Sequence, residues 1–238
     1  MPLSKGDFIL IDYVAKIKDT GEIFDLTIEE VAKKENVYRD DVLYEPMLVV
    51  VGEKWILESL EEELMKMEPN EQKTIELPPE KAFGARDPSK VRVISARELS
   101  RRGVTPRVGA RIEIDGKLAV IRSVGAGRVV VDFNHPLAGK TLVYDVKIVK
   151  KLVSDKEKIQ ALIHRRIPSI PGDKFDVRIR GKVLTITIPE EAFFVDGLQY
   201  AKRGVAHDIE KFFPKISTVR FVEEYSFKRE EEEAASKK

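Results

Sequence analysis

The chain has 238 residues, of which 42% are apolar and 35% are charged, yet its formal net charge is only +1. It has no cysteine, which excludes a disulfide framework and thiol chemistry. It also has no run of the roughly 18–20 apolar residues that a membrane span needs, and its first residues lack the apolar core of a signal peptide. We therefore expect a cytoplasmic protein with no membrane association.

The charge is unevenly distributed along the chain. From Arg86 to Arg128 there are eleven Lys and Arg residues against four Asp and Glu residues. A local excess of positive charge on a chain whose total charge is nearly zero predicts a binding surface on that segment.

The first part of the chain predicts strands around one helix. Branched and aromatic residues indicate strands at residues 7–17, 22–25, 47–51 and 72–77, with a short helix near 28–34. The apolar stripe of Ile56, Leu57, Leu60 and Leu64 predicts a helix that opens at Gly52 and ends at Pro69-Asn70.

The basic segment predicts a small β unit. Strands are expected at residues 91–95, 111–114, 117–124 and 128–133, with a helix at 96–102. Asp115-Gly116 is typical of a two-residue type I′ hairpin turn. A further strand is expected at residues 141–149.

The chain changes character at Ser154, which forms a capping-box pattern with Glu157 at the start of a helix. Two alternating strands follow, then a helix from Asp196 and a last strand over Val219–Phe227. This order, α-β-β-α-β, predicts a separate α+β domain. The final residues, 228–238, form a charged tail with nothing to bury.

Three motifs carry a resemblance to a known family. They are GEIFDLT at 21–27, GEKWILESLEEEL at 52–64 followed by Ala82-Phe83-Gly84, and DFNHPLAGKTLVYDVKI at 132–148. In this order they resemble the FKBP-type peptidyl-prolyl cis/trans isomerases over residues 5–152. The inserted residues before NHPLAGKTL resemble the SlyD-like branch with an insert-in-flap domain, and the added C-terminal domain resembles the long-chain archaeal type.

The resemblance implies an α+β protein in which an FKBP-like antiparallel sheet wraps one helix. A small β flap domain is inserted, and a C-terminal α-β-β-α-β domain follows. The expected domains are an isomerase domain at 1–85 and 134–152, an insert-in-flap chaperone domain at 86–133, a C-terminal domain at 153–227 and the tail at 228–238.

The resemblance also implies the site residues. The residues expected to take part in catalysis are Tyr13, Asp25, Phe83 and Tyr144. Those expected to line the substrate pocket are Phe24, Ile56, Leu57 and Leu60, and those expected to bind clients on the flap are Val91, Val93, Ile94, Leu99, Val120 and Ile121. Phe83 stands where the family usually has tyrosine, which removes one expected hydrogen bond to the substrate.

Such residues suit the chemistry of proline isomerisation. Rotation about a peptide bond has a barrier of about 18–20 kcal/mol and breaks no bond, so no nucleophile, cofactor or metal is required. A dry aromatic pocket removes the preference that water has for the planar, dipolar amide, and catalysis is then better binding of the twisted state. We expect Asp25 to orient Tyr13 and to interact with the twisted amide, not to act as a general base.

Two other functions remain open at this stage. The chain could be a client-binding chaperone or adaptor without catalysis, or it could associate with nucleic acid or the ribosome through its basic flap. The expected partners are unfolded or proline-containing polypeptides, and the C-terminal domain is expected to pair two subunits or to extend the client surface.

Overall fold

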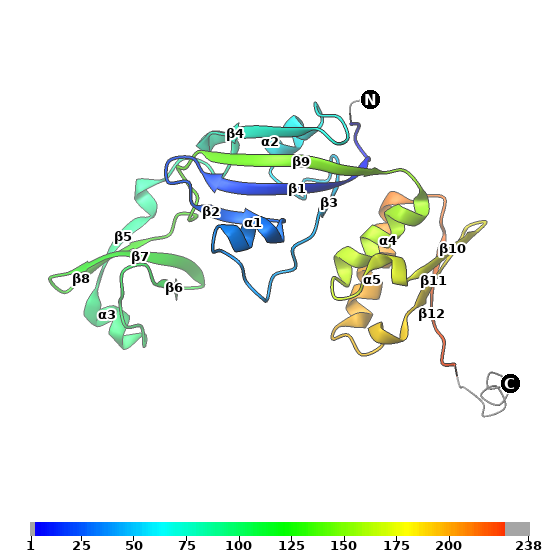
Figure 1. Ribbon diagram of the computed structural model, residues 1–238. Coiled ribbons are helices and arrows are strands. Elements are labelled where there is room, and N and C mark those ends of the chain that lie inside the picture. The colour runs from blue at the N-terminus through cyan, green and yellow to red at the C-terminus, as the bar shows by residue number, and fades with distance from the viewer. Residues whose placement is uncertain (1–2, 227–238) are drawn as a thin grey trace.

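The computed structural model describes residues 3–226 and has three β-sheets, each with its own helices (Figure 1). The sheet in the centre of the view is flanked by a second sheet at one end and a third at the other. The fold is thus α+β with mainly antiparallel sheets, as predicted.

The central sheet has the strand order β2-β1-β9-β4, and β3 pairs with β1. Its elements are β1 (Phe8–Ile17), β2 (Ile23–Leu26), α1 (Glu29–Lys34), β3 (Met47–Val50), α2 (Glu58–Leu64), β4 (Gln72–Leu77) and β9 (Leu142–Leu152). Leu60 and Leu64 of α2 are buried in one apolar core with alternate residues of β1 and β9. The predicted arrangement of one sheet on one helix is therefore present.

The α2 helix is shorter than the sequence predicts. It begins at Glu58, because Gly52 and Lys54 both have positive φ values, of 95° and 55°, and form a turn. The backbone N–H of Gly52 donates to the buried carboxylate of Glu61 at 2.8 Å, which ties this turn to the helix. The apolar stripe marked the buried face correctly but not the helix start.

The segment 86–133, called the flap below, forms the second sheet with the order β5-β8-β7-β6. Its elements are η2 (Pro88–Lys90), β5 (Val91–Ser95), α3 (Ala96–Arg101), β6 (Arg111–Ile114), β7 (Lys117–Gly125) and β8 (Arg128–Asp132). Asp115 and Gly116 have φ values of 52° and 74°, as a type I′ turn requires. The flap has a core of its own, drawn from residues between Ile94 and Phe133.

The C-terminal segment, residues 153–226, forms the third sheet, with the order β10-β11-β12. Its elements are α4 (Asp155–Arg166), η3 (Gly172–Lys174), β10 (Asp176–Arg180), β11 (Val183–Ile188), η4 (Glu190–Ala192), α5 (Leu198–Phe212) and β12 (Thr218–Glu223). The predicted α-β-β-α-β order is confirmed, and so is the capping box of Ser154 and Glu157. The predicted last strand ends earlier, at Glu223, and the expected tail lies outside the described residues.

Candidate active site

Tyr13 and Asp25 form the polar centre of the candidate site. Tyr13 lies on β1 and Asp25 on the neighbouring β2, and the Tyr13 hydroxyl donates to the Asp25 carboxylate at 2.8 Å. Backbone hydrogen bonds near the pair hold the two strands in register, since Thr27 N–H donates to the Tyr13 carbonyl at 3.1 Å. The Tyr13 side chain is nearly buried, whereas Asp25 reaches solvent.

Two further aromatic rings surround this pair. Tyr144 on β9 lies 6.0 Å from the Tyr13 ring, and Phe24 on β2 meets the Tyr144 ring edge-on, also at 6.0 Å. Edge-to-face contacts of this kind are favourable between aromatic rings. The three rings come from three adjacent strands, so the sheet itself assembles the aromatic wall.

Burial changes the acidity of both tyrosines. It raises the pKa of the Tyr144 hydroxyl to about 12, and the negative charge of Asp25 adds to this. The pKa of Tyr13 is raised even further, by burial first and then by Asp25. Both hydroxyls are therefore neutral hydrogen-bonding groups at any physiological pH, which suits a reaction without proton transfer.

The remaining predicted pocket residues pack on the same core. Leu60 is buried, and Ile56, Leu57 and Phe83 are partly buried against the cluster that contains Tyr13 and Tyr144. The structure thus brings together all eight residues predicted for the isomerase pocket.

Met47 and His135 belong to this region but were not predicted as site residues. The Met47 sulfur lies 4.0 Å from the Tyr13 hydroxyl oxygen, whose proton is donated to Asp25. The His135 ring stacks on Phe83 with centroids 4.0 Å apart and an angle of 9° between planes. Sequence patterns mark Met47 only as the start of an apolar strand and His135 only as a turn residue, because their neighbours come from distant segments.

A cavity of about 240 Å³ lies beside the polar pair. Phe24 and Asp25 form one wall, and the other comes from the segment between α1 and β3 through Val37, Arg39 and Tyr44. Within this segment, the rings of Tyr38 and Tyr44 stack on each other. Nothing in the sequence singles it out, since it reads as an acidic loop.

A larger groove, of about 420 Å³, joins the flap to the rim of the site. Its walls include Leu118 and Val120 of β7, and it ends at Phe133, His135 and Pro136. Because His135 stacks on Phe83, the groove reaches the edge of the aromatic cluster.

The predicted client-binding residues of the flap divide into two groups. Val91, Ile94 and Val120 are partly exposed, and Val93 is 63% exposed. Leu99 and Ile121 are fully buried in the flap core, so the expectation that they contact clients does not hold for this conformation. Leu118, at 76% exposed, was missed, because strand alternation alone does not show which face of the flap is covered.

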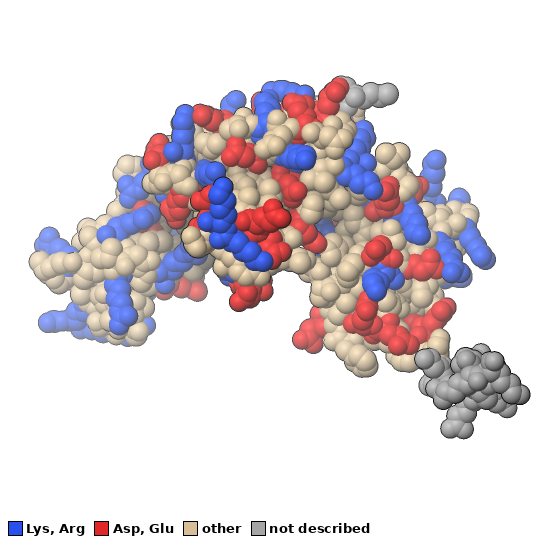
Figure 2. Space-filling view, viewed as in Figure 1, with Lys and Arg blue, Asp and Glu red and all other residues tan. Residues whose placement is uncertain are grey.

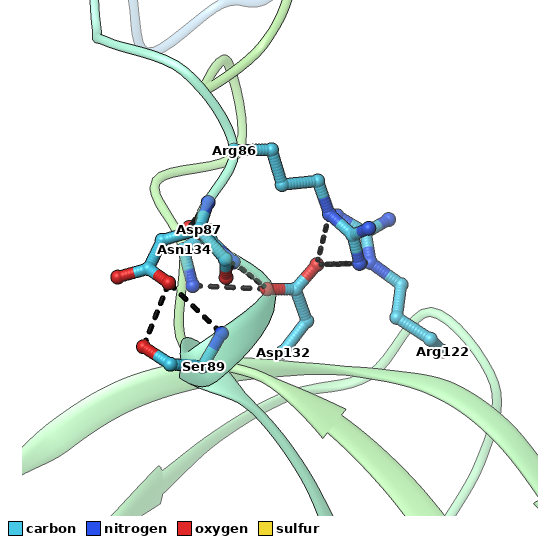
Figure 3. Close-up of polar contacts among 6 residues, drawn as sticks. All are labelled: Arg86, Asp87, Ser89, Arg122, Asp132 and Asn134. Atoms are coloured by element: carbon cyan, nitrogen blue, oxygen red, sulfur yellow. Dashed lines mark hydrogen bonds and ion pairs between the residues drawn. The ribbon is translucent and has the colours of Figure 1, made fainter.

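A buried carboxylate lies where the flap joins the central part of the chain (Figure 3). Asp132, whose side chain is 0% exposed, accepts hydrogen bonds from Arg86 at 2.9 Å and Arg122 at 3.2 Å. On its other side it accepts from the Asn134 side chain at 2.8 Å, and Asn134 in turn exchanges hydrogen bonds with the backbone of Asp87. These contacts hold together the two segments that connect the flap to the central sheet, one at Arg86 and Asp87 and the other at Asp132 and Asn134.

Asp132→Asn is expected to weaken this junction in a pH-dependent way. Burial by itself raises the pKa of Asp132, but the hydrogen bonds from Asn134, Arg86 and Arg122 outweigh it and hold the pKa well below its usual range. Because the folded pKa is lowered, the stabilisation is present above the unfolded value of about 3.9 and is lost as the pH falls below it. At pH 7 the variant should lose about 2 kcal/mol of flap stability, measured by amide exchange of β8.

The control for this prediction is Asp115→Asn. Asp115 pairs with Arg102 on the flap surface and sits at positive φ, which asparagine also tolerates. An exposed pair of this kind is worth at most about 1 kcal/mol. Equal effects of the two substitutions, or an Asp132→Asn effect that persists unchanged at pH 3, would contradict the assignment.

Two observations bear on other kinds of site. Within residues 3–226, no three His, Asp or Glu side chains gather so that they could hold a metal ion. In the same range, no helix has both the length and the apolar character to cross a membrane.

Comparison with family models gives two matches. The model described as FKBP26, IF domain matches residues 92–137, and the model described as FKBP26_C-terminal matches residues 155–226. The first of these ranges contains the flap sheet except for Val91, and the second contains the third sheet.

Comparison with curated proteins gives relatives that match up to 72% of the chain. The chain is 36% identical over 146 residues to a short-type peptidyl-prolyl cis-trans isomerase of Methanocaldococcus jannaschii, which covers 61% of this chain and 92% of the relative. It is 34% identical over 110 residues to an FKBP-type 16 kDa peptidyl-prolyl cis-trans isomerase of Escherichia coli, covering 44% and 73%. It is 27% identical over 176 residues to the isomerase SlyD of Treponema pallidum, covering 72% and 91%. This chain therefore belongs to the FKBP-type peptidyl-prolyl cis-trans isomerases, in the SlyD-like branch with an IF domain and an added C-terminal domain.

Proposed function

We propose that this protein catalyses the cis/trans isomerisation of X–Pro bonds in unfolded or nascent chains and holds those chains during the reaction. The observation that carries the proposal is the hydrogen bond from the Tyr13 hydroxyl to Asp25 beside the rings of Phe24 and Tyr144. Family membership supports the same activity.

The geometry suits the stabilisation of a twisted amide. A prolyl ring packed against Tyr144 and Phe24 would exclude water from the amide. Because the planar amide is better hydrated than the twisted one, this loss of water destabilises the planar form more. Asp25 accepts from Tyr13 and so fixes the direction of its hydroxyl, and its exposed carboxylate lies next to the space where the amide would turn. The neighbouring cavity at Val37 and Tyr44 offers room for a residue that flanks the proline.

The flap supplies a place to hold the client. Its outer strands β5 and β6 have one unpaired edge each, to which an extended chain could add as a further strand. Exposed apolar side chains such as Val93 and Leu118 lie on this sheet, and the groove along β7 leads to His135 at the rim of the pocket. A bound chain would then present its prolines to the site at a local concentration of roughly millimolar order.

The test is the refolding of a protein whose slow step is trans-to-cis proline isomerisation, with this protein present in catalytic amounts. We expect the slow phase to accelerate in proportion to the concentration of the added protein, with no change in its final amplitude. A slow phase that keeps its rate, together with suppressed aggregation, would leave a holding chaperone without catalysis.

The charge of the flap favours acidic clients. Seen as in Figure 2, the flap lobe carries many Lys and Arg side chains, whereas Asp and Glu are plentiful over the middle of the molecule and over the C-terminal segment. Several flap arginines are engaged, since Arg86 and Arg122 pair with Asp132 and Arg102 pairs with Asp115. A nucleic-acid partner is the alternative. It predicts an affinity for RNA whose logarithm falls by several units for each tenfold rise in salt concentration. Client binding that weakens only modestly with salt would favour acidic polypeptides.

We further propose that the isomerase domain comprises residues 1–85 and 134–152, the client-binding flap 86–133 and the C-terminal domain 153–227, and that the protein acts in the cytoplasm. The three separate sheets support this division, and the flap also has a core of its own.

The C-terminal domain is proposed to pair two copies of the chain. Phe194 and Tyr200 are 91% and 84% exposed and lie close in sequence, between η4 and the first turn of α5. Exposed aromatic side chains of this kind are enriched at protein interfaces. Phe194→Ser with Tyr200→Ser should convert a dimer to a monomer in sedimentation equilibrium, whereas Tyr38→Ser, an exposed aromatic outside this segment, should not. An intact chain that sediments as a monomer would exclude the pairing.

A further inference from the structure

The C-terminal segment packs directly against strands that build the isomerase pocket. Along β3, Met47 and Val49 face the core that contains Tyr13, whereas Leu48 and Val50 face the core that contains α4 and α5. Side chains of a strand alternate between its two faces, so one short strand serves both cores. The strand that α4 contacts is therefore also part of the wall of the pocket.

The segment before α2 has the same double role. Trp55 packs on the C-terminal core, with its ring edge-on to Phe212 at 6.1 Å and the Arg165 guanidinium 3.8 Å above it. The next two residues, Ile56 and Leu57, pack on the core of the pocket. The structure thus places Trp55 between two parts of the chain.

A polar contact links the same two parts. The His164 Nε2 atom of α4 lies 2.7 and 2.8 Å from the two carboxylate oxygens of Glu45. The opposite ring nitrogen, Nδ1, lies 2.7 Å from the carbonyl oxygen of Ile170, which fixes the orientation of the ring. Glu45 is only two residues before Met47, and the Met47 sulfur touches the Tyr13 hydroxyl.

We propose that the C-terminal domain is a structural part of the isomerase site, and that His164 is a positioning residue for Met47 and, through it, for Tyr13. The inference rests on the proposed function and adds to it a role in catalysis for a domain that lies outside the pocket. A turning amide is stabilised only if the walls of the pocket are held in place, and displacements of about 1 Å can cost large factors in rate.

The experiment uses the full-length chain with His164→Ala, and with His207→Ala as a matched control. His207 is also in the C-terminal segment, but its side chain is 73% exposed, and its ion-pair contact is with Glu210 on its own helix. The substrate is a short X–Pro peptide. We expect kcat/KM to fall about five- to tenfold in His164→Ala, mainly through kcat, and to stay unchanged in His207→Ala. His164→Gln, which keeps a donor toward Glu45, should recover most of the activity.

A second measurement tests the inference without an activity assay. The chain has only four methionines, so the Met47 methyl group can be resolved by NMR after labelling the methionine methyl groups with carbon-13. We expect its resonance to shift in His164→Ala, while those of Met65 and Met67, at the C-terminal end of α2, stay in place. Thermal unfolding is recorded alongside, to show that each variant is folded at the assay temperature.

The outcomes separate two failures. If the intact protein has no isomerase activity, the proposed function is wrong, and the Met47 resonance still decides whether the C-terminal domain sets the pocket wall. If the intact protein is active, but His164→Ala matches His207→Ala in kcat and in the Met47 resonance, the contact is merely structural and the inference is overturned.

Discussion

Tyr13→Ala combined with Asp25→Ala should lower kcat/KM for a short X–Pro peptide about 100-fold, the scale seen when a preorganised polar group is removed from an active site. The pair provides the polar groups beside the aromatic cluster, and the Tyr13 ring contacts Tyr144. Removing both leaves the amide without an oriented partner and admits water to the site. The measurement is the rate of cis-to-trans conversion, followed by NMR exchange at several peptide concentrations.

Two further variants protect this result from a trivial explanation. Tyr13 is nearly buried, and truncating a buried aromatic ring costs about 3–5 kcal/mol of stability. Tyr13→Phe keeps the ring and removes only the hydroxyl, so the fold is preserved and about a tenfold loss is expected. Tyr225→Ala, at a tyrosine that is 63% exposed and lies far along the chain, should leave the peptide activity unchanged. Full activity in the double variant would show that the amide turns elsewhere.

Replacing residues 88–133 by a short Gly-Ser loop should lower the catalysis of protein refolding about 100-fold. The reason is that the flap no longer raises the local concentration of the client chain at the pocket. The same change should leave the activity on a short peptide within about twofold, because a short peptide reaches the pocket without being held. The cut is placed so that Asp87 and Asn134 stay, since their mutual hydrogen bonds hold the two chain ends together.

A point variant tests the same idea with the flap in place. Val93→Ser with Leu118→Ser removes two exposed apolar side chains without touching the flap core. Refolding catalysis should fall part of the way toward the loop variant, while peptide activity stays constant. An equal loss on both substrates would mean that the flap shapes the pocket and does not hold the client.

The pocket residues could be named from the sequence because three motifs carry them in order. Tyr13, Phe24 and Tyr144 lie on neighbouring strands, and the resemblance to the family implies the position of each of them in the pocket. Met47 and His135 were not predicted as site residues, because their contacts join segments far apart in the chain. Leu99 and Ile121 were assigned to the client surface because apolar character alone does not distinguish a small core from an exposed face.

The sequence by itself determined the α+β class, nearly every strand and the order of the three sheets, because these follow from local periodicity, turn residues and caps such as Ser154 with Glu157. It did not determine where α2 begins, since the turn at Gly52 depends on the side chain of Glu61 nine residues later. Nor could it show that Trp55, Leu48 and His164 join the C-terminal domain to the pocket. Those contacts arise only when two separate cores meet on opposite faces of β3, and no local pattern encodes that meeting.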